Sequence, residues 1–153
     1  MSPRIAVFAG TFDPITLGHV DIVKRALDLF DEVWVAIGVN SNKKTLFSTE
    51  QRMAWVKACF PNEARLHVDS YEGLTVEFCK AKGARYLVRG LRNGTDFDYE
   101  AHIAQLNKSL WNEVETVFVL SAPELSYISS TLVRDVIAHN GNFQQYLPEA
   151  VQF

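Results

Sequence analysis

Apolar and polar positions follow one another in two alternating patterns along the chain. Short strand-like segments occupy residues 4–9, 32–39, 65–70, 86–89 and 116–120, and most of them are nearly continuous apolar runs, typical of strands buried on both faces. Apolar residues recur at helical spacing over residues 18–30, 48–60, 74–82, 96–110 and 129–139, and Pro148 begins a last short turn. Five such β–α repeats predict an α/β fold, a Rossmann-like, doubly wound sheet of five parallel strands in a single domain over residues 1–153.

Several helix ends carry recognisable signals. Ser48, with Gln51 three residues later, has the pattern of a capping box, and Pro61 ends that helix. Gly83 is a suitable left-handed residue to end the helix before it. In doubly wound sheets, ligands bind beyond the carboxyl ends of the strands. We therefore expect function in the loops after strands one, two, four and five, which begin at Gly10, Asn40, Arg89 and Ser121.

The first of these loops, residues 10–19 (GTFDPITLGH), contains neither a G-x-G-x-x-G fingerprint nor a P-loop. It joins a strand to a helix that opens on Gly18 and His19. At Gly18 the backbone can approach a phosphate, and His19 can donate to a phosphoryl oxygen. The alternative is a plain strand–helix turn with a surface histidine.

The second and fourth loops supply cations. Lys43 and Lys44 are either a solvated surface pair or include one flexible cation for an anionic substrate, for which we prefer Lys43. Arg89 and Arg92 flank a glycine at a strand end, where their guanidinium groups suit phosphate oxygens. The alternative is ion pairs with the acidic residues of the next helix, which are Asp96, Asp98 and Glu100.

The last main helix begins with three hydroxyl side chains, Ser129, Ser130 and Thr131. One hydroxyl is enough for an N-cap, so three suggest a second anion-binding helix end. Arg134, one turn later, either supports that site or is surface charge.

Composition narrows the function classes. A net charge of −3, with 48% hydrophobic and 22% charged residues, argues against binding nucleic acid through a global basic field. No apolar run approaches the roughly 20 residues of a membrane span, and the N-terminus lacks a signal-peptide pattern. Cys59 and Cys79 stand alone, which favours a reduced, cytoplasmic protein. The four histidines have no zinc-ligand spacing, so we expect no metal held by the protein.

Taken together, the segments resemble the phosphopantetheine adenylyltransferases of bacterial coenzyme A synthesis, nucleotidyltransferases with an [HT]-x-G-H signature. The matching pieces are residues 10–14, 16–19 (TLGH), 41–44 (SNKK), 89–92 (RGLR), 96–100 (DFDYE) and 128–131 (ISST). Their order and spacing cover essentially the whole chain. The resemblance implies transfer of AMP from ATP to 4′-phosphopantetheine, giving dephospho-coenzyme A and pyrophosphate.

The resemblance also implies the site residues. Phosphopantetheine is expected against Thr11, Lys43, Thr75 and Arg89. ATP is expected against Thr11, Phe12, His19, Gly90, Leu91, Arg92, Glu100, Leu125, Ser126, Tyr127, Ile128, Ser129, Ser130 and Thr131. Further implications are a homohexamer and inhibition by coenzyme A.

The attacking phosphate is already ionised, so the mechanism needs no general base, and His19, Lys43 and Arg92 are the expected catalytic residues. His19 donates to the α-phosphate, Lys43 and Arg89 hold the attacking phosphate, and Arg92 and the helix beginning at Ser129 hold pyrophosphate. Mg²⁺ is expected mainly on the ATP phosphates. Two alternatives are another acceptor or nucleotide, such as nicotinamide mononucleotide or a cytidylyl transfer, and a noncatalytic ATP-sensing module.

Overall fold

The computed structural model describes all residues, 1–153. Its strands are β1 (Ile5–Gly10), β2 (Glu32–Gly38), β3 (Leu66–Tyr71), β4 (Tyr86–Leu91) and β5 (Glu115–Leu120). Its helices are α1 (Leu17–Leu29), α2 (Thr49–Cys59), α3 (Thr75–Lys82), α4 (Gly94–Leu110) and α5 (Ser130–Ala138), with short 3₁₀ turns η1 (Pro123–Leu125) and η2 (Gln144–Tyr146). All strand pairs are parallel, in the order β3-β2-β1-β4-β5. This confirms the predicted α/β class and sheet.

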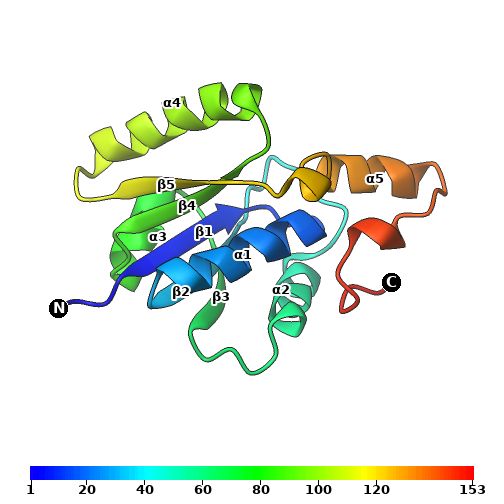
Figure 1. The fold of residues 1–153 in the computed structure, drawn as a ribbon, viewed down its shortest axis with the longest axis horizontal. Coiled ribbons are helices and arrows are strands. Elements are labelled where there is room, and N and C mark those ends of the chain that lie inside the picture. The colour runs from blue at the N-terminus through cyan, green and yellow to red at the C-terminus, as the bar shows by residue number, and fades with distance from the viewer.

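Helices cover both faces of the sheet (Figure 1). On one face, Ala6 and Phe8 of β1 belong to a core with α1 and α2. On the other face, Val7 and Ala9 pack in a second core with α3. Alternate residues of β1 are thus buried on opposite faces, which explains why this central strand is apolar throughout. No helix combines the length and the apolar character that crossing a bilayer requires.

Most predicted ends lie within one or two residues of the observed ones. Gly83 ends α3 in the left-handed region at φ 67°, as predicted. Ser48 caps α2 by accepting from the Gln51 N–H at 3.2 Å, but the Gln51 side chain makes no return bond, so only half of the predicted capping box forms. The turn at Pro148 forms through a hydrogen bond from the Val151 N–H, and η2 precedes it unpredicted.

One correction bears on the site. Gly90 and Leu91 were expected in a loop, but they extend β4 and pair with Val119 and Leu120 of β5. A strand rather than a loop therefore carries Arg89, Gly90 and Leu91, and Arg92 follows directly after its end.

Strand order decides where a ligand can bind. β1 lies between β2 and β4, and the chain moves outward from β1 to β3 before it returns to β4. The connections leaving β1 and β4 therefore diverge, which opens a crevice at their carboxyl ends. Figure 1 shows α5 beyond the end of β1.

Candidate active site

Two adjoining cavities lie at the carboxyl ends of β1 and β4. The first, which we call the α5 cavity, measures about 320 Å³ and is bounded by the starts of α1 and α5. The second, the α4 cavity, measures about 340 Å³ and extends along α4. Both are lined by a common set of residues, the shared wall: Ala9, Gly10, Thr11, Lys43, Arg89 and Glu100. Two ligands bound in these cavities would meet at the shared wall.

The first loop is shaped by a close approach of Phe12 to Gly10. Phe12 has a left-handed backbone at φ 50°, and its ring is buried. A Cβ added to Gly10 would lie 3.1 Å from this ring, so the position accepts only glycine without a shift. The Phe12 ring also meets the His19 ring edge-on, with centroids 4.9 Å apart. Phe12 thus packs against the histidine, and both residues line the α5 cavity.

Hydrogen bonds fix the tautomer of His19. The backbone N–H of Thr16 donates to His19 Nδ1 at 3.0 Å, while the His19 N–H donates to Thr16 Oγ1 at 3.4 Å, a reciprocal capping box at the start of α1. Because Nδ1 accepts, the ring proton of the neutral imidazole lies on Nε2. His19 lines the α5 cavity with this N–H as its remaining donor.

His19 is also held neutral. Burial, together with the positive charges of Arg89 and Arg92, lowers its pKa from the ordinary 6.5 to about 4. The imidazole is therefore uncharged at neutral pH and acts as a hydrogen-bond donor through Nε2 rather than as a cation. It is a poor general base, because Nδ1 is occupied and the ring resists protonation.

Lys43 reaches the shared wall, where its Nζ donates to Thr11 Oγ1 at 2.9 Å. It makes no ion pair with an acidic side chain. Lys44 lines neither cavity. Of the two lysines, the structure thus brings to the site the one that sequence reasoning preferred.

Arg89 is a partly buried partner of the buried Glu100. Its Nε and Nη2 donate to the two Glu100 carboxylate oxygens, each at 2.7 Å, and Nη1 donates to the carbonyl oxygen of Ala9. Burial alone would lower the pKa of Arg89, but the hydrogen bonds and charge of Glu100 outweigh it and raise the pKa. These contacts use three of the five N–H donors and leave two free of protein partners, and Arg89 lines both cavities.

Arg92 is held by Asp96, which accepts from its Nε at 2.9 Å and from its backbone N–H at 3.0 Å. The hydrogen bonds from Arg92 lower the pKa of Asp96. Both arginines thus form the acidic pairs that sequence reasoning had kept as the alternative. Both nevertheless line the α5 cavity, together with Gly90.

The hydroxyls at the start of α5 have internal partners. Ser129 Oγ accepts from the Leu132 N–H as the N-cap, and Ser130 Oγ donates to the Pro14 carbonyl at 2.7 Å. Thr131 Oγ1 accepts from Arg134 at 3.2 Å. All three residues and Ile128 line the α5 cavity. An anion here would meet the helix N-terminus and its backbone N–H groups rather than three free hydroxyls.

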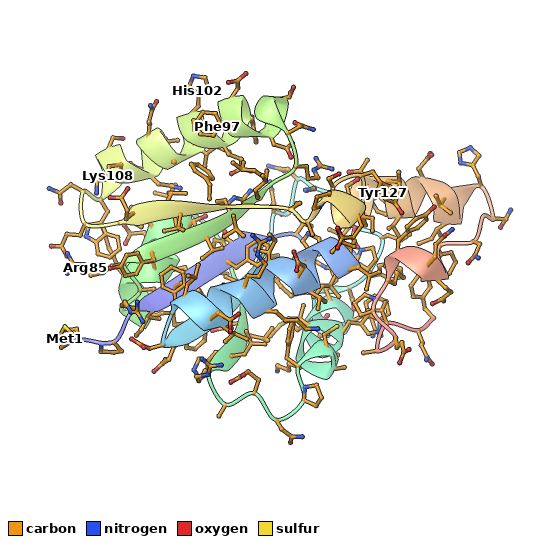
Figure 2. The ribbon with its side chains drawn as sticks, in the orientation of Figure 1. Met1, Arg85, Phe97, His102, Lys108 and Tyr127 are labelled. Atoms are coloured by element: carbon orange, nitrogen blue, oxygen red, sulfur yellow. The ribbon has the colours of Figure 1, made fainter.

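Some expected ATP contacts lie apart from the cavities. The residues that line neither cavity are Leu91, Leu125, Ser126 and Tyr127. The Ser126 hydroxyl donates to the Pro123 carbonyl, and the Tyr127 side chain is exposed near η1 (Figure 2). Their assignment to ATP stays a prediction.

The α4 cavity contains residues that sequence reasoning missed. Thr75 lines it as expected, and its hydroxyl hydrogen-bonds the Tyr71 hydroxyl at 2.8 Å. Ile103 and Asn107 of α4 line it as well, beside Glu100. Ile103 lies three residues after Glu100, and Asn107 lies seven residues after it. This spacing places all three on one helix face and could have identified them from the sequence.

The family model described as cytidylyltransferase-like matches residues 7–136. A solved bifunctional NMN adenylyltransferase/ADP ribose pyrophosphatase from Francisella tularensis superposes with a TM-score of 0.70 at 17% identity, over 95% of this chain and 45% of that longer one. At this identity the superposition shows the shared fold alone.

Curated relatives are far more similar. Phosphopantetheine adenylyltransferases from Flavobacterium psychrophilum and Christiangramia forsetii are 50% and 48% identical, covering 97% and 96% of this chain and 98% and 97% of theirs. One from an Acidovorax species is 47% identical over 99% of this chain and 92% of its own. The chain therefore belongs to the cytidylyltransferase-like family and, within it, to the phosphopantetheine adenylyltransferases.

The lowered pKa of His19 predicts a pH-dependent stability. Between about pH 4 and 6.5 the unfolded chain binds a proton at His19 that the folded chain does not, so the free energy of unfolding rises with pH across this window. The slope from this group is at most about 1.4 kcal/mol per pH unit. Urea unfolding from pH 4.5 to 7.5 should show a shallower rise for His19→Gln. The exposed His139→Gln is the control, and equal slopes for wild type and His19→Gln would contradict the assignment.

Proposed function

We propose that this chain transfers the adenylyl group of ATP to 4′-phosphopantetheine, giving dephospho-coenzyme A and pyrophosphate. The observation that carries the proposal is the pair of cavities with one shared cationic wall, since a reaction between two anions needs such a meeting point. Membership in the family supports the identity of both substrates.

ATP suits the α5 cavity and phosphopantetheine the α4 cavity. The α5 cavity combines the His19 donor, Arg92 and a helix N-terminus, which are groups suited to a triphosphate. The α4 cavity is lined by the apolar residues Leu87 and Ile103 and by the polar residues Thr75 and Asn107. A long arm with apolar stretches and amide groups matches that mixture.

The reaction is a direct displacement at the α-phosphorus of ATP. An oxygen of the acceptor phosphate forms the new P–O bond as the bond to pyrophosphate breaks, with no proton to remove first. Lys43 and the two free N–H groups of Arg89 hold the acceptor phosphate and offset repulsion between the anions. His19 Nε2–H donates to the α-phosphate as charge develops there, and Arg92 with the start of α5 holds the departing pyrophosphate.

Mg²⁺ is proposed to enter as part of the nucleotide substrate. The carboxylates nearest the cavities are already bonded to N–H donors: Asp13 to backbone amides, Glu100 to Arg89 and Asp96 to Arg92. No group of three or more His, Cys, Asp or Glu side chains is arranged to hold a metal. Oxygens of the ATP phosphates are then the remaining ligands, which Mg²⁺ prefers.

We extend the proposal to assembly, regulation and compartment. Helix α4 buries only Glu100 and exposes Tyr99, Leu106 and Leu110, an apolar surface that supports assembly with further copies, and the family resemblance implies a homohexamer. Figure 2 shows His102 on the side of α4 that faces away from the sheet.

Coenzyme A shares its pantetheine arm with the acceptor and is proposed to inhibit by competition. The free cysteines support a cytoplasmic location.

Pyrophosphate release tests the function directly. We expect release from ATP with Mg²⁺ only when 4′-phosphopantetheine is added, because the attacking oxygen comes from that acceptor. Parallel reactions contain nicotinamide mononucleotide, no acceptor, or CTP in place of ATP. Release with nicotinamide mononucleotide alone, or preference for CTP, would identify a different transferase, and ATP binding without release in any reaction would identify an ATP sensor.

Replacing His19 by Ala tests its role in the transition state. Loss of one well-placed donor to developing charge should reduce kcat by about 10²- to 10³-fold. ATP affinity, measured by calorimetry, should change only a few-fold, because the bond strengthens as the reaction proceeds. Lys44→Ala serves as a control at an exposed site-proximal position. Turnover of His19→Ala within a few-fold of wild type would remove His19 from the mechanism.

A further inference from the structure

Two buried charged side chains lie close to the site without lining either cavity. Asp13 is 2% exposed and Arg52 is 3% exposed, and Glu100 is the only other charged residue in the buried set. Burying a charge is costly unless hydrogen bonds compensate for the lost water. The partners of Asp13 and Arg52 therefore indicate what these residues hold in place.

Asp13 joins the first loop to the second. Its two carboxylate oxygens accept from the backbone N–H groups of Leu46 at 2.8 Å and Phe47 at 2.9 Å. Arg52 joins the same two loops through carbonyl oxygens, donating to Phe47 at 3.1 Å and to Thr11 at 2.8 Å. Charge-assisted hydrogen bonds of this kind are shorter and stronger than neutral ones.

The end of the second loop is thus fixed at Phe47 from several sides. Asp13 binds its N–H and Arg52 its carbonyl oxygen, and its ring packs against Trp55 and Phe153 with centroids 4.7 Å away in each case. Gly38 at the end of β2 anchors the other end of this loop. The exposed Lys43 lies between Gly38 and Phe47.

The side chains of Thr11 and Lys43 lie 2.9 Å apart. Both residues are held in place by Asp13 and Arg52. Arg52 binds the Thr11 carbonyl oxygen, and Asp13 fixes the chain three residues after Lys43. Without these bonds, a lysine on an exposed loop would lose more conformational freedom on binding a phosphate. The loop would also present its ammonium group over a wider range of positions.

We propose that Asp13 and Arg52 are positioning residues that hold the Lys43 loop in register with Thr11 and thereby set the binding of the acceptor phosphate. Neither touches substrate. The kinetic part of this inference rests on the proposed function, whereas the structural part does not.

Hydrogen exchange tests the structural part without any activity. Asp13→Asn keeps the shape but offers one acceptor oxygen in place of two, and Arg52→Lys keeps the charge but loses the planar fork. Amide exchange over residues 40–47 should accelerate about tenfold or more in both variants, with β1 and β4 unchanged. Asp31→Asn, which removes a carboxylate acceptor of a backbone N–H at the opposite end of the sheet, is the matched control.

A kinetic cycle with Lys43→Ala tests the positioning part. Asp13→Asn should raise the KM for 4′-phosphopantetheine about tenfold and the KM for ATP less than threefold, and should have little further effect in the Lys43→Ala background. Fully additive effects, equal changes in both KM values, or unchanged exchange over residues 40–47 would overturn the proposal.

Failure of the two proposals can be told apart. A wild-type protein without transferase activity contradicts the proposed function, and the exchange result then decides the role of Asp13 and Arg52 alone. If Asp13→Asn does not fold, Arg52→Lys decides. If neither variant folds, the two residues serve the stability of the whole fold and the positioning role is overturned.

Discussion

The site depends on how the loop after β1 satisfies its own buried polar groups. This loop lies at the crevice between β1 and β4, where its carbonyl oxygens need donors. Arg52 of α2 supplies one to Thr11, and Arg134 and Ser130 of α5 supply others to Asp13 and Pro14. The donors to these carbonyl oxygens tie α2 and α5 to the end of β1, and Arg52 also binds Phe47 at the end of the Lys43 loop. The same bonds that make the loop stable therefore bring the walls of both cavities together.

The two arginines of the site are paired with acidic side chains, whereas its lysine is not. Arg89 and Arg92 are each held by a carboxylate, which fixes their geometry and limits the net positive field. Lys43 has only a hydroxyl partner and is the cation free to meet an incoming anion. His19 stays neutral because it is buried beside the arginines. The site thus offers fixed donors to developing negative charge, without a nucleophile or base of its own.

Much of this could be predicted from sequence. All five strands were located, and the signal was strongest for β1 and β2, because strands buried on both faces are nearly all apolar. The signal was weaker for β3, in which His67, Asp69 and Ser70 alternate with or follow apolar residues. The loops with Gly10, Lys43, Arg89 and Ser129 were identified because parallel strands place their carboxyl ends together. The extension of β4 to Leu91 was missed, since it depends on pairing with β5 rather than on local pattern. The same holds for the contact between Asp13 and Phe47, 34 residues apart, which no local spacing encodes.

The central claim is that two phosphates meet at the shared wall and react directly, with no covalent link to the protein. The stereochemical course at the α-phosphorus tests this most directly. An ATP analogue made chiral at that phosphorus by one sulfur atom would be turned over with 4′-phosphopantetheine, and the configuration of the product determined by phosphorus NMR. A single in-line displacement predicts inversion. Retention would require two displacements through a protein-bound intermediate and would contradict the account.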